Sequence, residues 1–152
     1  MIDSMPTTDV ADAERFERIG IIADARSAAQ TRHAFAGWLR QFFNLDAARL
    51  SDLVLAIYEA LANSAEFAYV GADHAGTMDV LARYDPTRFK ITVTVSDRGR
   101  WRMSEPAART LSRGRGIPLI RALSDHASID STDHGTDVRM EWTNVGPRAA
   151  AS

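Results

Sequence analysis

The run from Arg88 to Ser96 restricts the folds open to this chain more than any other segment. Apolar residues occupy every second position of this run, and they are Phe89, Ile91, Val93 and Val95. Such a period of two is typical of a strand with one buried face and one face in water. The chain is therefore expected to form a sheet that other elements cover on one side.

Other segments supply further strands and the covering helices. Asp24 and Asp46 each precede a segment with helical apolar spacing, and both residues are suited to cap a helix N-terminus. The first helix is expected to run to about Phe43, and a third, short helix is expected over 114–125, with Pro118 tolerated in its first turn. The expected strands cover residues 16–23, 77–84, 88–96, 126–130 and 136–142.

The order of these elements indicates the fold class. Successive strands joined by tight turns, one of them containing Asp85-Pro86, point to an antiparallel or mixed sheet with helices on one face. We predict an α+β protein, a two-layer α/β sandwich with a mixed, mostly antiparallel sheet. One domain is expected over 14–145, between a flexible N-terminal leader at 1–13 and a flexible C-terminal tail at 146–152.

The composition excludes several classes of protein. The 152 residues are 45% hydrophobic and 25% charged, as in an ordinary globular domain, and a net charge of -2 gives no basis for direct nucleic-acid binding. No apolar run approaches the roughly 20 residues that span a bilayer, and the first residues do not resemble a secretion signal. The absence of cysteine excludes disulfides and thiolate chemistry, and it fits a cytoplasmic location.

Glu59 and Asn63 are the first candidates for a functional site. They stand one turn apart on the second expected helix, and Glu59 is the only charged residue between Leu53 and Ala65. The pair is expected nearly opposite an apolar stripe, which indicates a cavity rather than bulk water. An amide oxygen is a suitable Mg²⁺ ligand, and a carboxylate can accept a hydroxyl proton. A capping or surface pair is the alternative. The stripe consists of Leu50, Val54, Ile57 and Leu61.

Asp97 follows the strand of 88–96 with the parity of Val95, so its side chain is expected on the buried face. A buried carboxylate needs hydrogen-bond donors, and the exocyclic amine of adenine is one such donor. Gly99 would let a flat ring approach the backbone. The alternative is an Asp-Arg-Gly turn by which the chain leaves the strand.

The segment Arg113-Gly114-Arg115-Gly116 precedes the third expected helix. Glycines at this position expose backbone N–H groups at the positive end of a helix, an arrangement that binds phosphate, and the two arginines would add charge. The alternative is a loop that needs glycine for its turns.

Thr136 follows Gly135 and shares the parity of Val138, so its hydroxyl is expected to face inward and to need a partner. Asp97 and an adenine edge are the two candidates for that partner. Alternatively, Thr136 is a β-favouring residue that starts a strand.

These segments, in this order, resemble the GHKL ATPase superfamily, and in particular the anti-sigma-factor serine kinases of the RsbW and SpoIIAB type. The resemblance spans roughly residues 24–142. The segments that carry it are Glu59-Ala-Leu-Ala-Asn63, Asp97-Arg-Gly99-Arg-Trp101, Arg113-Gly-Arg-Gly-Ile117 and Gly135-Thr136.

The resemblance implies the Bergerat ATP-binding fold, with ATP and Mg²⁺ bound between the helices. By position, Asn63 would hold Mg²⁺, Glu59 would be the general base and Asp97 would bind the adenine amine. Gly99 would border the adenine, and Gly114 and Gly116 would line the lid and the phosphates. The family phosphorylates a serine on a STAS-domain antagonist and sequesters a sigma factor, usually as a homodimer.

The resemblance thus implies an ATP-dependent serine/threonine kinase that acts in transcription regulation by partner switching, for example in a stress response. An ATP-binding module that captures a sigma factor or antagonist without phosphoryl transfer is the alternative. A sensor histidine kinase catalytic domain is a third hypothesis, and it would need a separate partner to supply the phosphoacceptor histidine.

Overall fold

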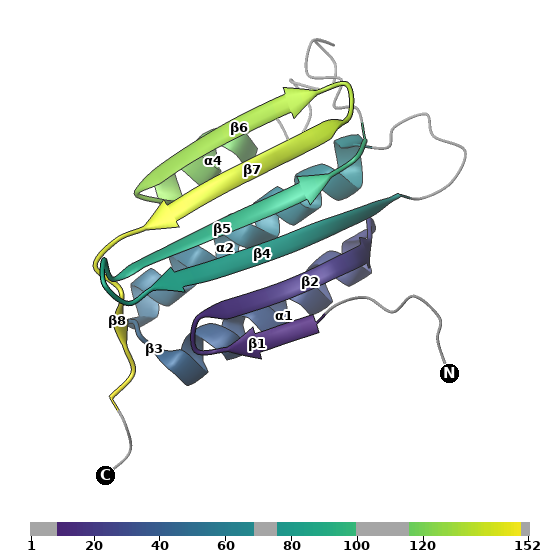
Figure 1. The fold of residues 1–152 in the computed structure, drawn as a ribbon. Coiled ribbons are helices and arrows are strands. Elements are labelled where there is room, and N and C mark those ends of the chain that lie inside the picture. The colour runs from purple at the N-terminus through teal and green to yellow at the C-terminus, as the bar shows by residue number, and fades with distance from the viewer. Residues whose placement is uncertain (1–8, 69–75, 100–115, 150–152) are drawn as a thin grey trace, which may run out of the picture.

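A six-stranded sheet, in the order β1-β2-β4-β5-β7-β6, forms one layer of the protein in the computed structural model, which describes residues 9–68, 76–99 and 116–149. All the described helices lie on one face of the sheet (Figure 1). The elements are β1 (Asp9–Asp12), β2 (Arg15–Ile22), α1 (Ala25–Phe42), β3 (Phe43–Asn44), α2 (Ala47–Asn63), η1 (Ser64–Ala68), β4 (Thr77–Asp85), β5 (Lys90–Asp97), α4 (Gly116–Leu123), β6 (His126–Thr132), β7 (Gly135–Trp142) and β8 (Gly146–Pro147).

Within the described part of the chain, each strand of the sheet pairs antiparallel with its neighbours. The predicted α+β class is confirmed. The sequence left open whether the sheet is mixed or antiparallel, and these strands are all antiparallel to their neighbours. The hairpins β1–β2, β4–β5 and β6–β7 account for three of these pairings, because a tight turn can join only antiparallel neighbours.

Both predicted helix caps are present. The side chain of Asp24 accepts a hydrogen bond of 2.7 Å from the backbone N–H of Ser27, and Asp46 accepts one of 2.7 Å from Arg49. The hydrogen bond from Ser27 also lowers the pKa of Asp24 below its ordinary value. Each cap satisfies a backbone donor that the first turn of a helix leaves without a helical partner.

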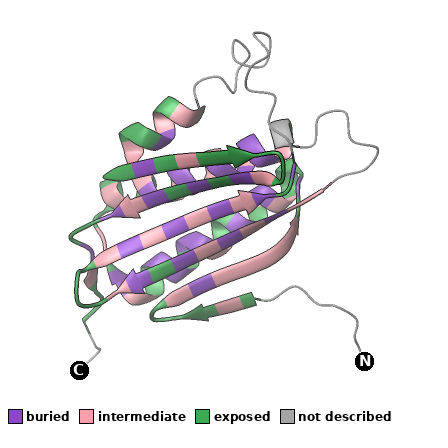
Figure 2. Ribbon diagram, turned by 45° about the horizontal axis from the view of Figure 1, so that its top comes forward, coloured by how far each residue is buried: buried purple, intermediate pink, exposed green. Residues whose placement is uncertain are grey.

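The core lies between the sheet and the helices. Along β4, β5 and β7 buried residues alternate with half-buried or exposed ones, so each strand turns one side to the helices and the other to solvent (Figure 2). On the helix side, α1 supplies Phe35 and Leu39, and α2 supplies Leu53 and Ile57, all fully buried. The half-buried strand pattern in the sequence is therefore explained by helices on one face only.

Phe89 does not continue the strand as the alternation predicted. It lies in the turn before β5, adopts a left-handed backbone conformation with φ 54°, and is 49% exposed. The turn is fixed by Asp85, whose Oδ1 accepts hydrogen bonds from the backbone of Thr87 and Arg88. The carbonyl of Phe89 accepts a hydrogen bond from Val145, which holds the turn against the C-terminal segment.

The predicted flexible leader and tail both contain paired strands. Residues Asp9–Asp12 form β1, which pairs with β2, and Gly146–Pro147 form β8, which pairs with the short strand β3. The indole of Trp38 further ties β1 to α1 through a hydrogen bond to the carbonyl of Asp12. None of the helices in the described ranges combines the length and the apolar character that a membrane span needs.

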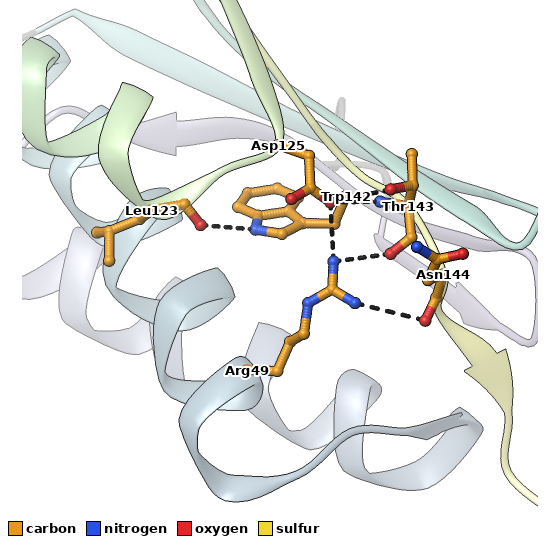
Figure 3. Close-up of polar contacts among 6 residues, drawn as sticks. All are labelled: Arg49, Leu123, Asp125, Trp142, Thr143 and Asn144. Atoms are coloured by element: carbon orange, nitrogen blue, oxygen red, sulfur yellow. Dashed lines mark hydrogen bonds and ion pairs between the residues drawn. The ribbon is translucent and has the colours of Figure 1, made fainter.

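Arg49 connects the N-terminal end of α2 to the strands near the start of β6 and the end of β7. Its Nη2 lies 2.8 Å from the carboxylate of Asp125 and donates to the carbonyl of Thr143 at 2.7 Å (Figure 3). Asp125 also accepts a hydrogen bond from the backbone N–H of Thr143. We call Arg49, Asp125 and Thr143 the arginine clasp. Beside it, Trp142 donates to the carbonyl of Leu123, the last residue of α4.

Candidate functional site

The C-terminal end of α2 buries two consecutive polar residues. Asn63 and Ser64 are each 1% exposed, and Ser64 begins the π-helical turn η1. Successive residues of a regular α-helix point about 100° apart, so burial of two polar neighbours at a helix end is unusual. π-helical turns occur frequently at functional sites, so this end of α2 is a candidate functional site.

Asn63 does not lie opposite the buried face of α2, as the apolar stripe had suggested. The buried face is formed by Leu53, Ala56 and Ala60 together with Ile57 and Leu61, and Asn63 continues it. Glu59 is half-buried at the edge of this face. The prediction erred because it counted only large apolar residues, whereas small alanines let α2 pack closely against its neighbours.

Asp97 lies at the end of β5 with its side chain on the helix side, as the strand parity predicted, and it is only 5% exposed. Its Oδ2 accepts a hydrogen bond of 2.8 Å from the hydroxyl of Ser64. Its Oδ1 accepts one of 3.1 Å from the backbone N–H of Gly99, which is buried. The Asp-Arg-Gly turn and the buried carboxylate, considered as alternatives, are therefore both present. The Ser64 contact joins the end of α2 to the end of β5.

Strand β7 approaches Asp97 closely from the other side. Gly135 has φ +150°, and a Cβ built on it would lie 2.0 Å from the carbonyl oxygen of Asp97. Thr136, the register partner of Asp97, is 2% exposed and therefore faces inward as predicted. Its hydroxyl lies 2.6 Å from that of Ser131 on β6, so its hydrogen-bond partner is Ser131 rather than Asp97, one of the two partners expected for it.

The glycine segment is only partly described. Gly116 is the first residue of α4, and Pro118 stands in the first turn of that helix as expected. Arg113, Gly114 and Arg115 lie outside the described residues, and so does Trp101. Helix α4 lies against α2, and its Ile120 is fully buried in the core, so Gly116 starts a helix that shares the core with α2.

The donor set at this end of the sheet suits a nucleotide with a hard cation. Asp97 offers a carboxylate held by two donors, while Asn63 and Glu59 offer oxygen atoms on the adjacent helix. Across the parts of the chain that are described, no group of three or more His, Asp or Glu side chains could hold a metal ion alone.

The sequence reasoning did not single out two polar residues of this site. Ser64 was overlooked because serine is common in helices and its partner Asp97 lies 33 positions away in the sequence. Ser131 was overlooked because an exposed edge strand has no sequence signal for an inward hydroxyl. For Ser64 a usable signal existed, since it directly follows Asn63 on a helix that has few polar residues.

Comparisons with known proteins identify the fold and the family. No curated protein shows a significant sequence match. The crystal structure of the RsbU and RsbW domains of Rv1364c from Mycobacterium tuberculosis is similar in fold, with a TM-score of 0.67 and 23% sequence identity. The match covers 91% of this chain and 34% of that one, so this chain spans about a third of the length of the solved protein.

A sequence model of the histidine kinase-like ATPase domain matches residues 21–142, which include Glu59, Asn63, Asp97 and Thr136. The matched region begins at the end of β2 and extends to the last residue of β7, so it contains every helix described above. This chain belongs to the histidine kinase-like ATPase domain family.

Proposed function

We propose that the protein is an anti-sigma-factor serine/threonine kinase. It binds ATP with Mg²⁺, transfers the γ-phosphoryl group to a serine of a STAS-domain antagonist, and sequesters a sigma factor. The family supports ATP binding. The serine acceptor, the sigma factor, the homodimer and the cytoplasmic location follow from the sequence resemblance and from the fold shared with an RsbW-containing protein.

One observation carries the proposal: the buried carboxylate of Asp97 is fixed at the end of β5 by Ser64, the residue that follows Asn63. A carboxylate costs several kcal/mol to bury unless donors surround it, so a protein retains one in such a place for a reason. Two hydrogen bonds hold it in one orientation before any ligand arrives. Such preorganisation is what recognition of a donor such as the adenine amine requires.

The sequence resemblance suggests the roles of the remaining residues. Asn63 would hold Mg²⁺ through its side-chain oxygen, and the ion would neutralise charge on the phosphates. Glu59, one turn earlier and half-buried, would accept the proton of the serine hydroxyl as that oxygen attacks phosphorus. Gly116, the first residue of α4, together with the residues that precede it in the sequence, Arg113, Gly114 and Arg115, would bind the phosphates, while Gly99 would border the adenine.

The proposal is tested by titration of ATP and Mg²⁺ into wild type, Asp97→Asn and Glu59→Gln. Asp97→Asn should weaken nucleotide binding by at least about tenfold, because hydrogen bonds to a charged acceptor contribute about 1.5–3 kcal/mol. Glu59→Gln should bind nucleotide almost as wild type does but transfer no phosphate to a purified STAS-domain antagonist. Asp52→Asn, a half-buried carboxylate near the start of α2, is the matched control and should behave as wild type.

Each result has a distinct meaning. Equal ATP affinity for Asp97→Asn and wild type would remove Asp97 from the site and with it the proposed pocket. ATP binding without any transfer by wild type would support the alternative, a module that captures its partner without catalysis. A phosphorylated product that is labile to acid would indicate histidine rather than serine as the acceptor.

A further inference from the structure

Three polar side chains form a row across the sheet at the end of β5. Asp97 on β5 pairs in register with Thr136 on β7, and Thr136 pairs in register with Ser131 on β6. Ser131 lies on the helix side of its strand, because it has the parity of the buried Ala127. Strands β5, β7 and β6 lie side by side (Figure 1), so the row extends from the buried Asp97 to the edge of the sheet.

The two hydroxyl groups of this row have different surroundings. Thr136 is 2% exposed, whereas Ser131 is exposed, and their hydroxyl oxygens lie 2.6 Å apart. Within the described residues, Ser131 is the only hydrogen-bond partner of the Thr136 side chain. A hydroxyl has one proton to donate and two lone pairs that accept. Water can satisfy what remains at Ser131, but at Thr136 the remaining capacity is directed away from water and toward the candidate site.

The direction of this hydrogen bond decides what Thr136 can offer to a ligand. Either of the two oxygens can be the donor. If Thr136 donates to Ser131, it presents only lone pairs to the site. If Ser131 donates to Thr136, the proton of Thr136 can point into the site. Because water can donate to Ser131 or accept from it, reversing the hydrogen bond costs little.

Asp97 determines which of the two directions suits a nucleotide. Its carboxylate is the proposed acceptor for the exocyclic amine of adenine, and the ring nitrogens on either side of that amine, N1 and N7, are themselves acceptors. The Cβ atoms of register partners lie about 4.5–5.5 Å apart, so one base can reach both Asp97 and Thr136. Thr136 must then donate to the ring nitrogen, and it can do so while bonded to Ser131 only if Ser131 donates to it.

We infer that Ser131 is a positioning residue for nucleotide recognition. Its hydroxyl donates to Thr136 and thereby turns the Thr136 proton toward a ring nitrogen of adenine, N1 or N7, beside the amine that Asp97 accepts. Ser131 itself does not contact the nucleotide. The inference rests on the proposed function and deepens it, because it makes a residue of the edge strand β6 part of the specificity for adenine.

A purely structural role for Ser131 makes a different prediction. A hydrogen bond between hydroxyl groups on neighbouring strands also stabilises a sheet. In that case Ser131→Ala would lower stability, but it would not change how the protein distinguishes between bases. The decisive measurement is therefore the preference for ATP over analogues that lack one ring nitrogen.

The test is titration with Mg²⁺ and each of ATP, 1-deaza-ATP and 7-deaza-ATP, in which a carbon replaces N1 or N7. Wild type should bind ATP about five- to tenfold more tightly than one of the two analogues, because that analogue loses one hydrogen bond. Ser131→Ala should reduce this preference to about twofold or less, through weaker binding of ATP. Ser131→Thr, which keeps the hydroxyl, should retain the preference of wild type.

A second variant tests whether Ser131 acts through Thr136. Thr136→Val removes the hydroxyl and keeps the shape of the side chain, so it should abolish the preference. Adding Ser131→Ala to Thr136→Val should then change nothing further. Ser128→Ala is the matched control, because Ser128 is an exposed serine on the same strand with the opposite parity, and it should bind all three nucleotides as wild type does.

The outcomes separate this inference from the proposed function. An unchanged preference in Ser131→Ala would overturn the inference, and so would equal affinity of wild type for ATP and both analogues. If ATP binding depends on Asp97 but not on Ser131, the proposed function stands and only the role of Ser131 is lost. If wild type binds no ATP, both are wrong.

Discussion

The two ends of α2 are held by contacts of different kinds. At the C-terminal end, polar groups are buried: Asn63 and Ser64 are each 1% exposed, and Ser64 reaches the carboxylate of Asp97. At the N-terminal end, the arginine clasp lies nearer the surface, with the Arg49 side chain 29% exposed and that of Asp125 46% exposed. The same helix therefore begins in a partly hydrated anchor and ends in a dry polar site.

The difference matters because water can replace a lost partner at the first end but not at the second. A buried polar group without its partner incurs the full desolvation penalty, whereas a surface group is rehydrated. Changes near Asp97 should therefore disturb both the fold and nucleotide binding, and changes near Arg49 should disturb stability alone. The following substitutions test that distinction.

The largest effect is expected for Gly135→Ala at the C-terminal end. The new Cβ would lie 2.0 Å from the carbonyl oxygen of Asp97, at a φ that L-residues rarely adopt. The clash and the backbone strain together should lower the free energy of unfolding by about 3 kcal/mol or more, as measured by urea denaturation. ATP binding should weaken in parallel, because the backbone at Asp97 must move.

Gly37→Ala provides the control for that substitution. No atom lies within 4 Å of a Cβ added at Gly37, which is in the interior of α1. Alanine should therefore raise the free energy of unfolding by about 0.5–1 kcal/mol through helix propensity. Equal stability of the two variants would show that β7 tolerates displacement from Asp97.

An intermediate effect is expected for Arg49→Ala at the N-terminal end. Loss of the charged hydrogen bonds to Asp125 and Thr143 should lower the free energy of unfolding by about 1.5 kcal/mol, the low end of the range for charged hydrogen bonds, because Arg49 and Asp125 are partly hydrated. ATP affinity, measured well below the unfolding temperature, should stay within about twofold of wild type. Arg49→Lys should recover only part of the stability, because an ammonium group cannot make the forked contact. A tenfold loss of ATP affinity in Arg49→Ala would show that the N-terminal end of α2 also affects nucleotide binding.

The smallest effect is expected for Tyr84→Phe, also remote from Asp97. The Tyr84 hydroxyl donates to the carbonyl of Val145 at 2.7 Å, so its removal should cost about 1 kcal/mol. Burial, and secondarily the charge of Asp85, raises the pKa of Tyr84 above its ordinary value of 10.0. As the pH rises, the unfolded chain therefore loses the hydroxyl proton of Tyr84 before the folded chain does. The stabilisation that this hydroxyl provides is complete below about pH 10 and declines as the pH rises through the folded-state pKa of Tyr84. The stability difference between wild type and Tyr84→Phe should show that decline, and a difference independent of pH would argue against it.

Local signals made most of the fold predictable. Asp24 and Asp46 cap their helices with side-chain oxygens only three residues from the donors, so the information lies in a short window. The parity of Asp97 was predictable for the same reason, because a strand alternates regardless of its partners. Strand β1 was not predictable, since an acidic segment has little strand propensity and its partner, β2, supplies the hydrogen bonds.

The candidate site was predictable in its individual residues but not in its connections. The pairing of Ser64 with Asp97 depends on how α2 is placed against β5, which no local pattern encodes. Likewise, Ser131 is unremarkable in the sequence, and only the register of β6 with β7 places it opposite Thr136. Contacts between distant segments are properties of the assembled sheet.

The π-helical turn after Asn63 has a consequence for chain length. Such a turn contains one residue more than an α-helical turn would, and a residue can be added or removed only as a whole unit. Within this turn, Ala65 and Glu66 should therefore tolerate exchanges of side chain, whereas Ser64, which donates to Asp97, should not. Deleting a single residue there would instead rewind the helix end and rotate everything that follows. After Ser64, the number of residues in the turn, more than their identity, should set the direction in which the backbone leaves the site.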